Sequence, residues 1–318
     1  MRLPDVRPVP GHSLTAGQQR WRRAKRYRLL YLLLLFPLAS LFIFDYIPIY
    51  GVTIAFKDYR FSKGILGSPW NDFWHFRVLF QDYYFGRILR NTVVISLLRL
   101  GFGFPAPIIL AILLNEVRST GFKKWVQTIS YLPHFMSWVV LASIVIEVFS
   151  PQRGLPAYLY RLLDIEPVPN VFTDPTLFLP MLISTGIWQG VGWGSIIYLA
   201  AMSSIDPELY ESAAIDGASR LQAAWHITVP SLLYVMVILF ILQLGQLLNA
   251  GFDQIFNLYN PLVYEVADII DTYVYRKGFE DRKYDFATAV GLFKNGVGVI
   301  LIVGANLIIR RHSEYGLW

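Results

Sequence analysis

The chain of 318 residues is 55% hydrophobic and only 16% charged, with a formal net charge of +6 and no cysteine. A soluble domain of this size carries about 25% charged residues, so the composition predicts an integral membrane protein. The lack of cysteine excludes disulfides, thiolate metal sites and cysteine nucleophiles. The basic residues lie at the ends of apolar runs, where membrane topology explains them without a nucleic-acid partner.

Six apolar segments are long enough to cross a bilayer, which takes about 20 residues in a helix. The first follows the basic stretch 20–28 and lacks the small-residue cleavage site of a signal peptide, so we expect it to remain as an anchor. The expected spans are 29–49, 91–114, 126–149, 177–202, 231–250 and 286–309. The pattern predicts an all-α integral membrane protein with six transmembrane helices.

The basic residues also predict the orientation of the spans, because they concentrate on the cytoplasmic side. Eight lysines and arginines precede residue 29, and others lie in the short loop 115–125 and after the last span. Both termini are therefore expected in the cytoplasm. The expected parts are a basic tail 1–28, a first transmembrane helix 29–49, an aromatic-rich outer loop 50–90, a core 91–310 with outer loops 150–176 and 251–285, and a cytoplasmic tail 311–318.

Two cations lie inside expected spans. Arg99 is eight residues into the second span and Lys294 is eight residues into the sixth. A charge at the centre of a span costs about 2.5–3.5 kcal/mol and usually faces the bundle interior. At roughly 12 Å along their helices, the two cations suit a polyanionic sugar. Equally, they could snorkel or pair with Glu147 or Asp45.

Tryptophans and amides in the fourth and fifth spans are candidates for a sugar pathway, because sugars bind flat apolar faces and amide groups. The amides could instead bond between helices, where each bond is worth about 0.6 kcal/mol. Gly186, Gly190 and Gly194 form a ridge that lets a neighbouring helix pack closely. The candidate pathway residues are Arg99, Lys294, Trp188, Gln189, Trp193, Gln243, Gln246 and Asn249.

The loop 203–230, between the fourth and fifth spans, carries strong helix signals. Asp206 can cap a helix that begins at Pro207, and Gly217 can end it in a left-handed conformation. Ser219 and Gln222 have the spacing of a capping box, which predicts a second helix. The loop is therefore expected to form two short cytoplasmic helices joined by a glycine turn.

The same loop resembles the EAA motif of bacterial ABC importer permeases. Glu211-Ser212-Ala213 is followed by Gly217 and then by Ile227-Thr228-Val229-Pro230, with Ser212 and Val229 departing from the usual alanine and leucine. In that family this segment is the coupling helix, which docks into the cytoplasmic ATPase. The resemblance implies the same role here for Glu211, Ser212, Ala213, Asp216, Gly217, Ile227 and Pro230.

Four further stretches look like the carbohydrate-uptake permeases, in particular the branch for polysaccharide fragments such as aldouronates and alginate. Within this branch the chain looks closest to the first membrane subunit of alginate importers. The stretches are YIPIYGVTIAFKDY (46–59), GILGSPWNDFWHF (64–76), LRNTVVISLLRLGFGFPAPIILAILLNEV (89–117) and TISYLPHFMSWVV (128–140).

The resemblance implies a type I ABC importer permease fold, with a cytoplasmic coupling helix, in the bacterial cytoplasmic membrane. It implies a heterodimer with a second homologous permease, two copies of a cytoplasmic ATPase subunit and an extracytoplasmic sugar-binding protein. The expected substrate is an oligosaccharide or polysaccharide, acidic as in alginate or another uronate. We expect no cofactor on this chain, because ATP and Mg would bind to the partner ATPase.

Three rival functions follow from the apolar composition alone. An ion-coupled secondary sugar transporter is the main rival, yet the chain shows no internal repeat of the kind common in such folds. A membrane enzyme is disfavoured, because the five histidines have no metal-ligand spacing and no phosphate-binding glycine loop precedes a Lys-Ser/Thr pair. A channel would need neither a coupling helix nor an ATPase.

Overall fold

The computed structural model describes residues 17, 25–165 and 167–312, so the expected tails 1–28 and 311–318 lie almost entirely outside it. The chain divides into two compact units, the first ending at Thr53. From residue 28 to the end of the first unit the chain is one helical run, and its α-helix is apolar almost all round, as expected of a helix in lipid. Its elements are α2 (Arg28–Leu41), a π-helical turn (Phe42–Tyr46), α3 (Ile47–Ile49) and the start of a 3₁₀ turn (Tyr50–Phe56).

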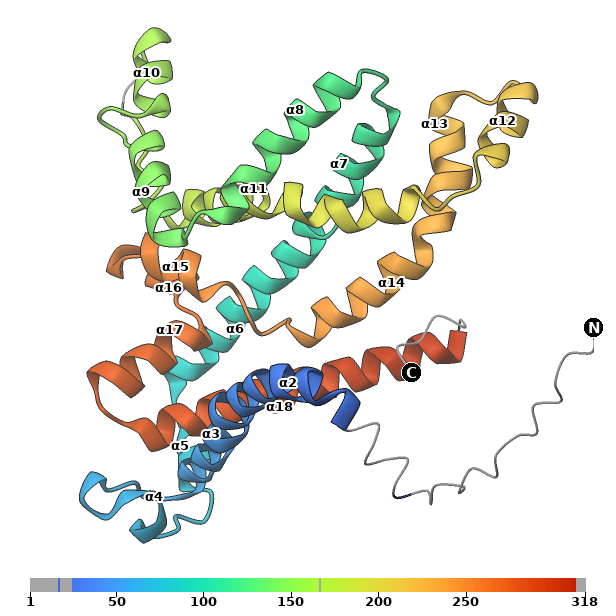
Figure 1. Cartoon of the computed structure of the whole chain (residues 1–318). Coiled ribbons are helices and arrows are strands. Elements are labelled where there is room, and N and C mark those ends of the chain that lie inside the picture. Colours follow the sequence, from blue (N-terminus) through green and yellow to red (C-terminus); the bar gives the residue numbers. More distant parts are fainter. Residues whose placement is uncertain (1–16, 18–24, 166, 313–318) are drawn as a thin grey trace, which may run out of the picture. The chain divides into compact units, whose positions relative to one another are not determined.

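The second unit, from Ile54 onward, consists of helices joined by turns and loops, and its described residues contain no strand beyond an isolated bridge between Lys57 and Trp70. The expected second span is a long helical segment of three parts, and the other long helices follow the expected fourth, fifth and sixth spans (Figure 1). These elements are α6 (Tyr83–Leu98), a π-helical turn η4 (Arg99–Gly103), α7 (Pro105–Glu116), α11 (Pro175–Met202), α14 (Val229–Gly245) and α18 (Tyr284–His312).

The expected third span is not one straight helix. Helices α8 (Thr120–Tyr131) and α9 (Trp138–Val148) meet at an angle of 110° across the 3₁₀ turn Leu132–Phe135. Pro133 lies in this turn, where it supplies no backbone N–H, and the Ser137 side chain caps the first turn of α9. The expected third span, 126–149, is therefore a bent pair of helices, which is either one broken span or a re-entrant loop.

Within the described residues, four helices are long and apolar enough to cross a membrane, or five if the bent pair counts as one span. The expected fourth span, α11, has 28 residues and is long enough. Its glycines, tryptophans and Gln189 make it less apolar than the other four. Six spans therefore remain a prediction.

Several expected boundaries shift. Helix α14 ends at Gly245, so Gln246 and Asn249 lie in the turn that follows and not in a span. Helix α6 begins at Tyr83, inside the expected outer loop 50–90. The other expected outer loops also fold into short helices. These are α10 (Leu155–Leu162), α15 (Phe252–Leu258), α16 (Tyr264–Ala267), α17 (Ile270–Tyr275) and a π-helical turn η8 (Arg276–Glu280).

Small residues allow the long helices to pack closely, which matters because burial gives little driving force between helices in a bilayer. Helix α11 crosses α7 and α8 (Figure 1), and a Cβ on Gly192 would lie 2.1 Å from the Ser130 carbonyl oxygen. Of the expected glycine ridge, Gly194 packs against Pro107, whereas Gly190 has no such neighbour within 4 Å. The ridge is therefore only partly a packing surface.

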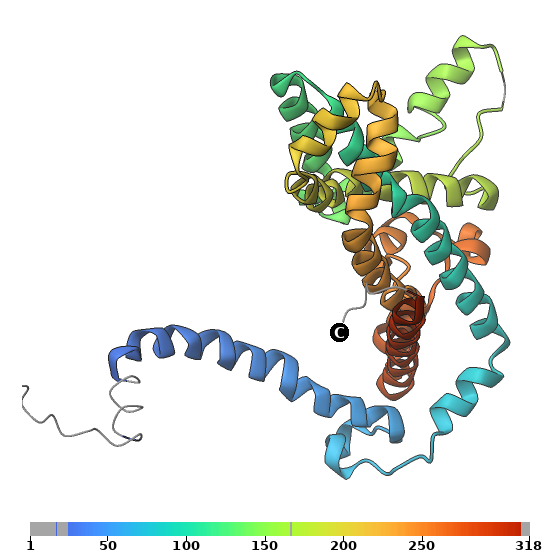
Figure 2. The ribbon, with the colours of Figure 1, turned by 90° about the vertical axis from the view of Figure 1, so that its right-hand side faces the viewer.

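A second close contact joins α14 to α18 (Figure 2). A Cβ on Gly245 would meet the side chain of Ile302 at 2.1 Å, and one on Gly298 would meet the Gly245 carbonyl oxygen at 2.7 Å. Glycine at both positions brings the two backbones together at the end of α14. This fixes the turn 246–251, which begins there.

A buried carboxylate holds the short helices that follow α14 against α6. Asp268 is fully buried and accepts hydrogen bonds from Tyr84 at 2.5 Å, from Thr272 at 2.6 Å and from both terminal nitrogens of Arg276. Burial alone would lower the pKa of Arg276, but the hydrogen bonds and charge of Asp268 raise it well above its usual range. Because a buried ion pair must be fully hydrogen-bonded to be tolerated, this cluster fixes α17 and η8 in one position.

Two groups of short helices lie at opposite ends of α14. The elements that follow α14, α15 to α17, lie at one end of it, and the two helices of loop 203–230 lie at the other (Figure 1). A single long helix therefore joins the expected cytoplasmic loop to the expected outer region.

Candidate functional site

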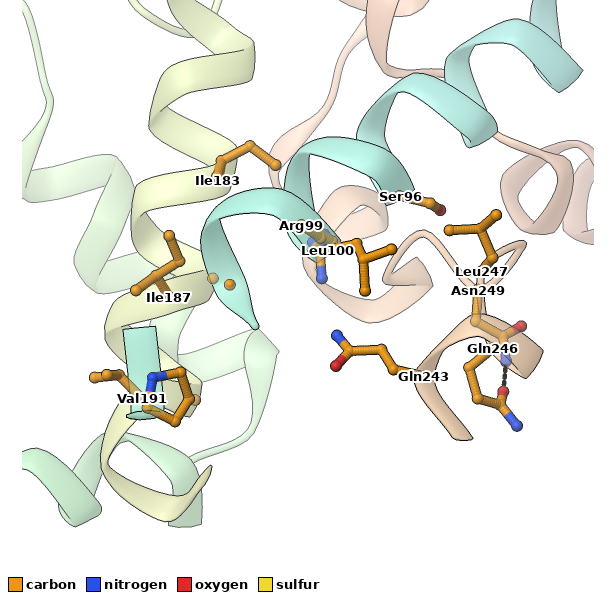
Figure 3. A pocket seen from close by; sticks show the side chains of 14 residues that line it. Ser96, Arg99, Leu100, Ile183, Ile187, Val191, Gln243, Gln246, Leu247 and Asn249 are labelled. Atoms are coloured by element: carbon orange, nitrogen blue, oxygen red, sulfur yellow. Dashed lines mark hydrogen bonds between the residues drawn. The ribbon is translucent and has the colours of Figure 1, made fainter. Parts of the chain in front are cut away.

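A cavity of about 340 Å³ opens between η4, α11 and the end of α14. This volume is within the range of small-molecule pockets, about 300–1,000 Å³. Figure 3 shows aliphatic side chains of α11 along one side and amides from α14 and the following turn on the other. The lining residues that carry polar side chains are Ser96, Arg99, Gln243, Gln246 and Asn249.

Arg99 supplies the positive charge of this cavity. It lies at the first position of the π-helical turn η4, a distortion often found at functional sites. Its Nη2 donates a hydrogen bond to the side-chain oxygen of Gln254, while its Nε is shielded from solvent and has no hydrogen-bond partner in the described residues. None of the described carboxylates forms a salt bridge with it. The cavity therefore contains a cation whose charge no carboxylate of the described chain neutralises.

Gln254 is itself held rigidly. It is 1% exposed, and its amide nitrogen donates to the Leu182 carbonyl oxygen and to Thr185 Oγ1, both at 2.8 Å. These two acceptors lie on α11, so Gln254 joins α15 to α11 and directs its oxygen toward Arg99. No sequence pattern points to Gln254, because it lies in the expected outer loop 251–285.

The amides that line the cavity differ in their hydrogen bonding. The Asn249 side chain donates to the Gln246 side chain, so these two satisfy part of each other's bonding capacity. The Gln243 side chain extends from α14 toward the cavity (Figure 3). Gln243 is therefore the amide best placed to bind a molecule in the cavity.

Lys294 does not share the cavity of Arg99. Its ammonium donates to the carboxylate of Asp271, and the two side chains are 14% and 22% exposed. Lys294 lines a neighbouring cavity of about 200 Å³, which shares Gln246 and Asn249 with the first. Its ion-pair partner is Asp271, not Glu147, which instead contacts Arg153 at 3.4 Å. Asp271, like Gln254, was not expected from the sequence.

The aromatic candidates of α11 lie elsewhere. Trp188, Gln189 and Trp193 are not among the residues that line the cavity. One face of Trp193 stacks on His134, with ring centroids 4.6 Å apart and planes 3° from parallel. This contact ties α11 to the turn between α8 and α9.

The loop 203–230 folds as the sequence predicts. Helices α12 (Pro207–Ile215) and α13 (Arg220–Ala223) are joined by Gly217, whose φ of +80° is left-handed. The side chain of Asp206 accepts from the Glu208 N–H, and Ser219 with Gln222 forms a capping box. The capping predictions are therefore confirmed.

A π-helical turn η6 (Ala224–Thr228) connects α13 to α14, so Ile227 lies in this turn and Pro230 in the first turn of α14. The Tyr210 and Thr228 hydroxyls are hydrogen-bonded at 2.9 Å, which fastens α12 to this turn. Arg220 also donates to the Glu116 carbonyl oxygen at the end of α7, at 3.4 Å. The loop is thus connected to two long helices.

The solvent-exposed surface of the loop 203–230 combines apolar and acidic side chains. Ile215 is 86% exposed and Leu221 is 80% exposed, and Glu211 and Asp216 are also exposed. None of the salt bridges of the described residues involves either acid. Such a surface is suited to a protein partner with a basic rim and an apolar groove.

Metal chemistry has no candidate site in the part of the chain that the structure describes. No group of three or more His, Asp or Glu residues there is arranged to hold an ion.

The sequence matches a family model. The description of that model is binding-protein-dependent transport system inner membrane component, and the match covers residues 103–311. Protein LplB of Bacillus subtilis (strain 168) is 44% identical over 318 residues, which is 99% of each chain. The polygalacturonan/rhamnogalacturonan transport system permease protein YteP of the same strain is 42% identical over 307 residues, covering 94% of this chain and 95% of the relative.

Two solved structures are also similar. A chain in the crystal structure of a bacterial ABC transporter involved in the import of the acidic polysaccharide alginate superposes with a TM-score of 0.84 at 42% identity, covering 93% of this chain and all of that one. A chain of a bacterial alginate ABC transporter in complex with an alginate pentasaccharide-bound periplasmic protein gives a TM-score of 0.83 at 42% identity, covering 93% of this chain and 99% of the other.

Proposed function

The chain belongs to the family of binding-protein-dependent transport system inner membrane components, and from this premise we propose that it imports acidic oligosaccharides built from uronic acids. It is a permease subunit of an ABC importer for sugars or polysaccharides. The subunit is not an enzyme, because ATP is hydrolysed by the partner ATPases. A permease of this kind works with a second permease, an ATPase and a periplasmic binding protein.

The similar proteins support an acidic substrate. One relative is named for polygalacturonan and rhamnogalacturonan, and the similar structures are described as importing or binding alginate. Polygalacturonan and alginate are chains of uronic acids, with one carboxylate on each sugar. Identity of 42% over nearly the whole chain makes a related substrate class the best starting hypothesis.

The observation that carries the acidic substrate is Arg99. It is the cation of a cavity large enough for a small ligand, and no carboxylate of the described residues pairs with it. A guanidinium binds carboxylates through parallel hydrogen bonds, and such charge-assisted bonds are about twice as strong as neutral ones. Gln243, Gln246 and Asn249 add the amides that sugar hydroxyls require. We assign this cavity to the substrate pathway.

Lys294 has a different place in the proposal. Asp271 neutralises it, so it adds little net charge to the pathway. Trp188, Gln189 and Trp193 remain candidates for sugar contact only if the pathway extends beyond this cavity.

We assign ATPase coupling to the exposed surface of α12 and α13, with Glu211, Ser212, Ala213, Asp216 and Gly217 at its centre. The proposed arrangement places this surface and both termini in the cytoplasm of a bacterium. There the chain pairs with a different but homologous permease and with two ATPase subunits. The outer helices α15 to α17 then face the sugar-binding protein. Ile227 and Pro230 continue the coupling segment into α14.

An ion-coupled secondary transporter gains no support from the family, because transport in this family depends on a binding protein. Copurification separates the two functions, since only an ABC permease retains an ATPase subunit.

The proposal is tested with the complete transporter in proteoliposomes. Uptake and ATP hydrolysis are measured for acidic oligosaccharides and neutral ones of equal length, each presented with the binding protein. We expect uronate chains to stimulate both activities more than neutral chains do. Stimulation by neutral chains alone would refute the acidic substrate while leaving the permease assignment in place.

A further inference from the structure

We infer that Gln254 is a positioning residue that sets the preference for acidic sugars. Its side-chain oxygen fixes the guanidinium of Arg99 at the cavity without cancelling its charge. The inference rests on the proposed function, and it adds a residue that does not line the cavity.

The geometry leaves Gln254 one way to face Arg99. Both hydrogen bonds of its amide nitrogen are made to α11, to the Leu182 carbonyl oxygen and to Thr185 Oγ1. Because the nitrogen is committed to these acceptors, the oxygen faces the arginine. A residue that is 1% exposed cannot turn without losing these bonds, and an unpaired buried polar group costs about 1–3 kcal/mol.

The choice of an amide, and not a carboxylate, determines the charge. Two other largely buried cations of this chain pair with aspartates, Arg276 with Asp268 and Lys294 with Asp271. Gln254 offers Arg99 the same kind of acceptor oxygen but no negative charge. The cavity therefore keeps a full positive charge in a place where carboxylate pairing would have removed it.

The backbone around Gln254 is shaped to hold the guanidinium. Gly251 has a φ of +89°, and a Cβ there would lie 2.4–2.6 Å from the Arg99 guanidinium atoms. Any other residue at this position would displace the arginine. Three features thus converge on one group: a glycine that makes room, an amide oxygen that orients, and an Nε that has no partner among the described residues.

The direct test compares a uronate oligosaccharide with its methyl ester, in which each carboxylate charge is replaced by a neutral ester that carries one more methyl group. Their kcat/KM values for uptake are measured with the complete transporter in proteoliposomes. The near-isosteric variant Gln254→Glu neutralises Arg99, so the acid-to-ester preference should fall by about tenfold or more. The variant Gln254→Met removes the acceptor and leaves the charge, so the preference should fall by a smaller factor, roughly threefold.

A matched control places a new carboxylate elsewhere. Gln127 is a half-buried glutamine of α8 that does not line the cavity, and Gln127→Glu should keep the wild-type preference. Assembly is checked by copurification of the ATPase, and the conclusion is drawn from whichever Gln254 variant assembles. A wild-type preference in an assembled Gln254 variant would overturn the inference. A wild-type transporter that takes acid and ester equally would instead overturn the proposed acidic substrate.

Discussion

The guanidinium of Arg99 is hydrogen-bonded to the side-chain oxygen of Gln254, a neutral group 155 positions away in the chain. The other cation of the expected pathway, Lys294, is bonded to the carboxylate of Asp271. The two cations look equivalent in the sequence, but Arg99 with its neutral partner keeps a net positive charge, whereas Lys294 with Asp271 has none. Arg99 can attract an anion, whereas Lys294 is part of a structural ion pair.

Removal of the Lys294 charge should therefore affect stability more than transport selectivity. Lys294→Met leaves Asp271 partly buried without a partner, which costs about 3–5 kcal/mol in buried pairs, somewhat less here because both side chains retain some exposure. Thermal unfolding of the purified complex in detergent measures this loss. The double variant Lys294→Met with Asp271→Leu should recover most of it, because it removes both charges. Equal thermal stability of the Lys294→Met variant and the wild type would show that the ion pair does not stabilise the protein.

Local signals explain which parts of the structure were predictable. The capping side chains bond to backbone groups only two or three residues away, as Asp206 and Ser219 do. The caps of α12 and α13 and the left-handed Gly217 therefore follow directly from the sequence. The long apolar helices follow from composition for the same reason. The pairing of Arg99 with Gln254 depends on how α15 packs against α11, and no local pattern encodes it.

The left-handed conformation at Gly217 is expected to be essential for coupling. Proline fixes φ near −65°, whereas Gly217 has a φ of +80° and donates its N–H to the Ala214 carbonyl oxygen. Gly217→Pro should still assemble with the second permease but lose substrate-stimulated ATP hydrolysis. Gly217→Ala, with about 1–2 kcal/mol of strain and open space around the new Cβ, should retain part of the activity. Normal transport by Gly217→Pro would mean that coupling occurs elsewhere.

Reversal of the Glu211 charge tests the same surface by another mechanism. Glu211 is exposed and free of salt bridges within the described chain, so it is available to a basic group of the ATPase. If that pair is partly desolvated on docking, Glu211→Lys should weaken ATPase binding by about a hundredfold. Titration of the ATPase onto immobilised permease measures the change, and Glu208→Lys on the same helix serves as the matched comparison. Unchanged affinity in Glu211→Lys would remove Glu211 from the interface.

The proposed topology is tested by labelling, which the cysteine-free chain makes simple. Single cysteines are introduced at Ile215 and Phe279, which are 86% and 71% exposed. An impermeant thiol reagent added to intact spheroplasts should label the cysteine at position 279 and not the one at 215. Labelling of the cysteine at position 215 from outside would show that the chain has the opposite orientation in the membrane.

A pH-dependent contact is expected between the segment 54–75 and the start of α18. His75 Nε2 lies 3.0 Å from the Lys57 carbonyl oxygen and 3.3 Å from the Asp285 carboxylate. Burial alone would lower the pKa of His75, but the hydrogen bonds and the charge of Asp285 raise it above the ordinary 6.5. The protonated form is thus favoured by folding. Its stabilisation is complete below about pH 6.5 and is lost as the pH rises through the raised value.

A spin label at position 62, introduced as Ser62→Cys, reports this contact. Its mobility should increase as the pH is raised through the folded pKa of His75, and His75→Gln should abolish the pH dependence. A label whose mobility, with His75 in place, is constant or falls with rising pH would contradict the assigned contact.

The bent third span shows a second limit of sequence reasoning. Pro133 marks a possible break, but a proline also fits a mild kink in a straight span. The angle of 110° depends on contacts of this turn with α11, including the stacking of His134 on Trp193. Packing between distant segments, and not the proline itself, decides between the two outcomes.

The most direct measurement of the proposed function is the acid-to-ester preference of the transporter with Arg99→Met. Uptake of a uronate oligosaccharide and of its methyl ester is compared in proteoliposomes that contain the binding protein, both permeases and the ATPase. If Arg99 binds a substrate carboxylate, the loss of this charged hydrogen bond should lower the preference by roughly 10- to 100-fold, with copurification of the ATPase intact. An Arg99→Met transporter that assembles and keeps the wild-type preference would contradict the assignment of this cavity to an acidic sugar.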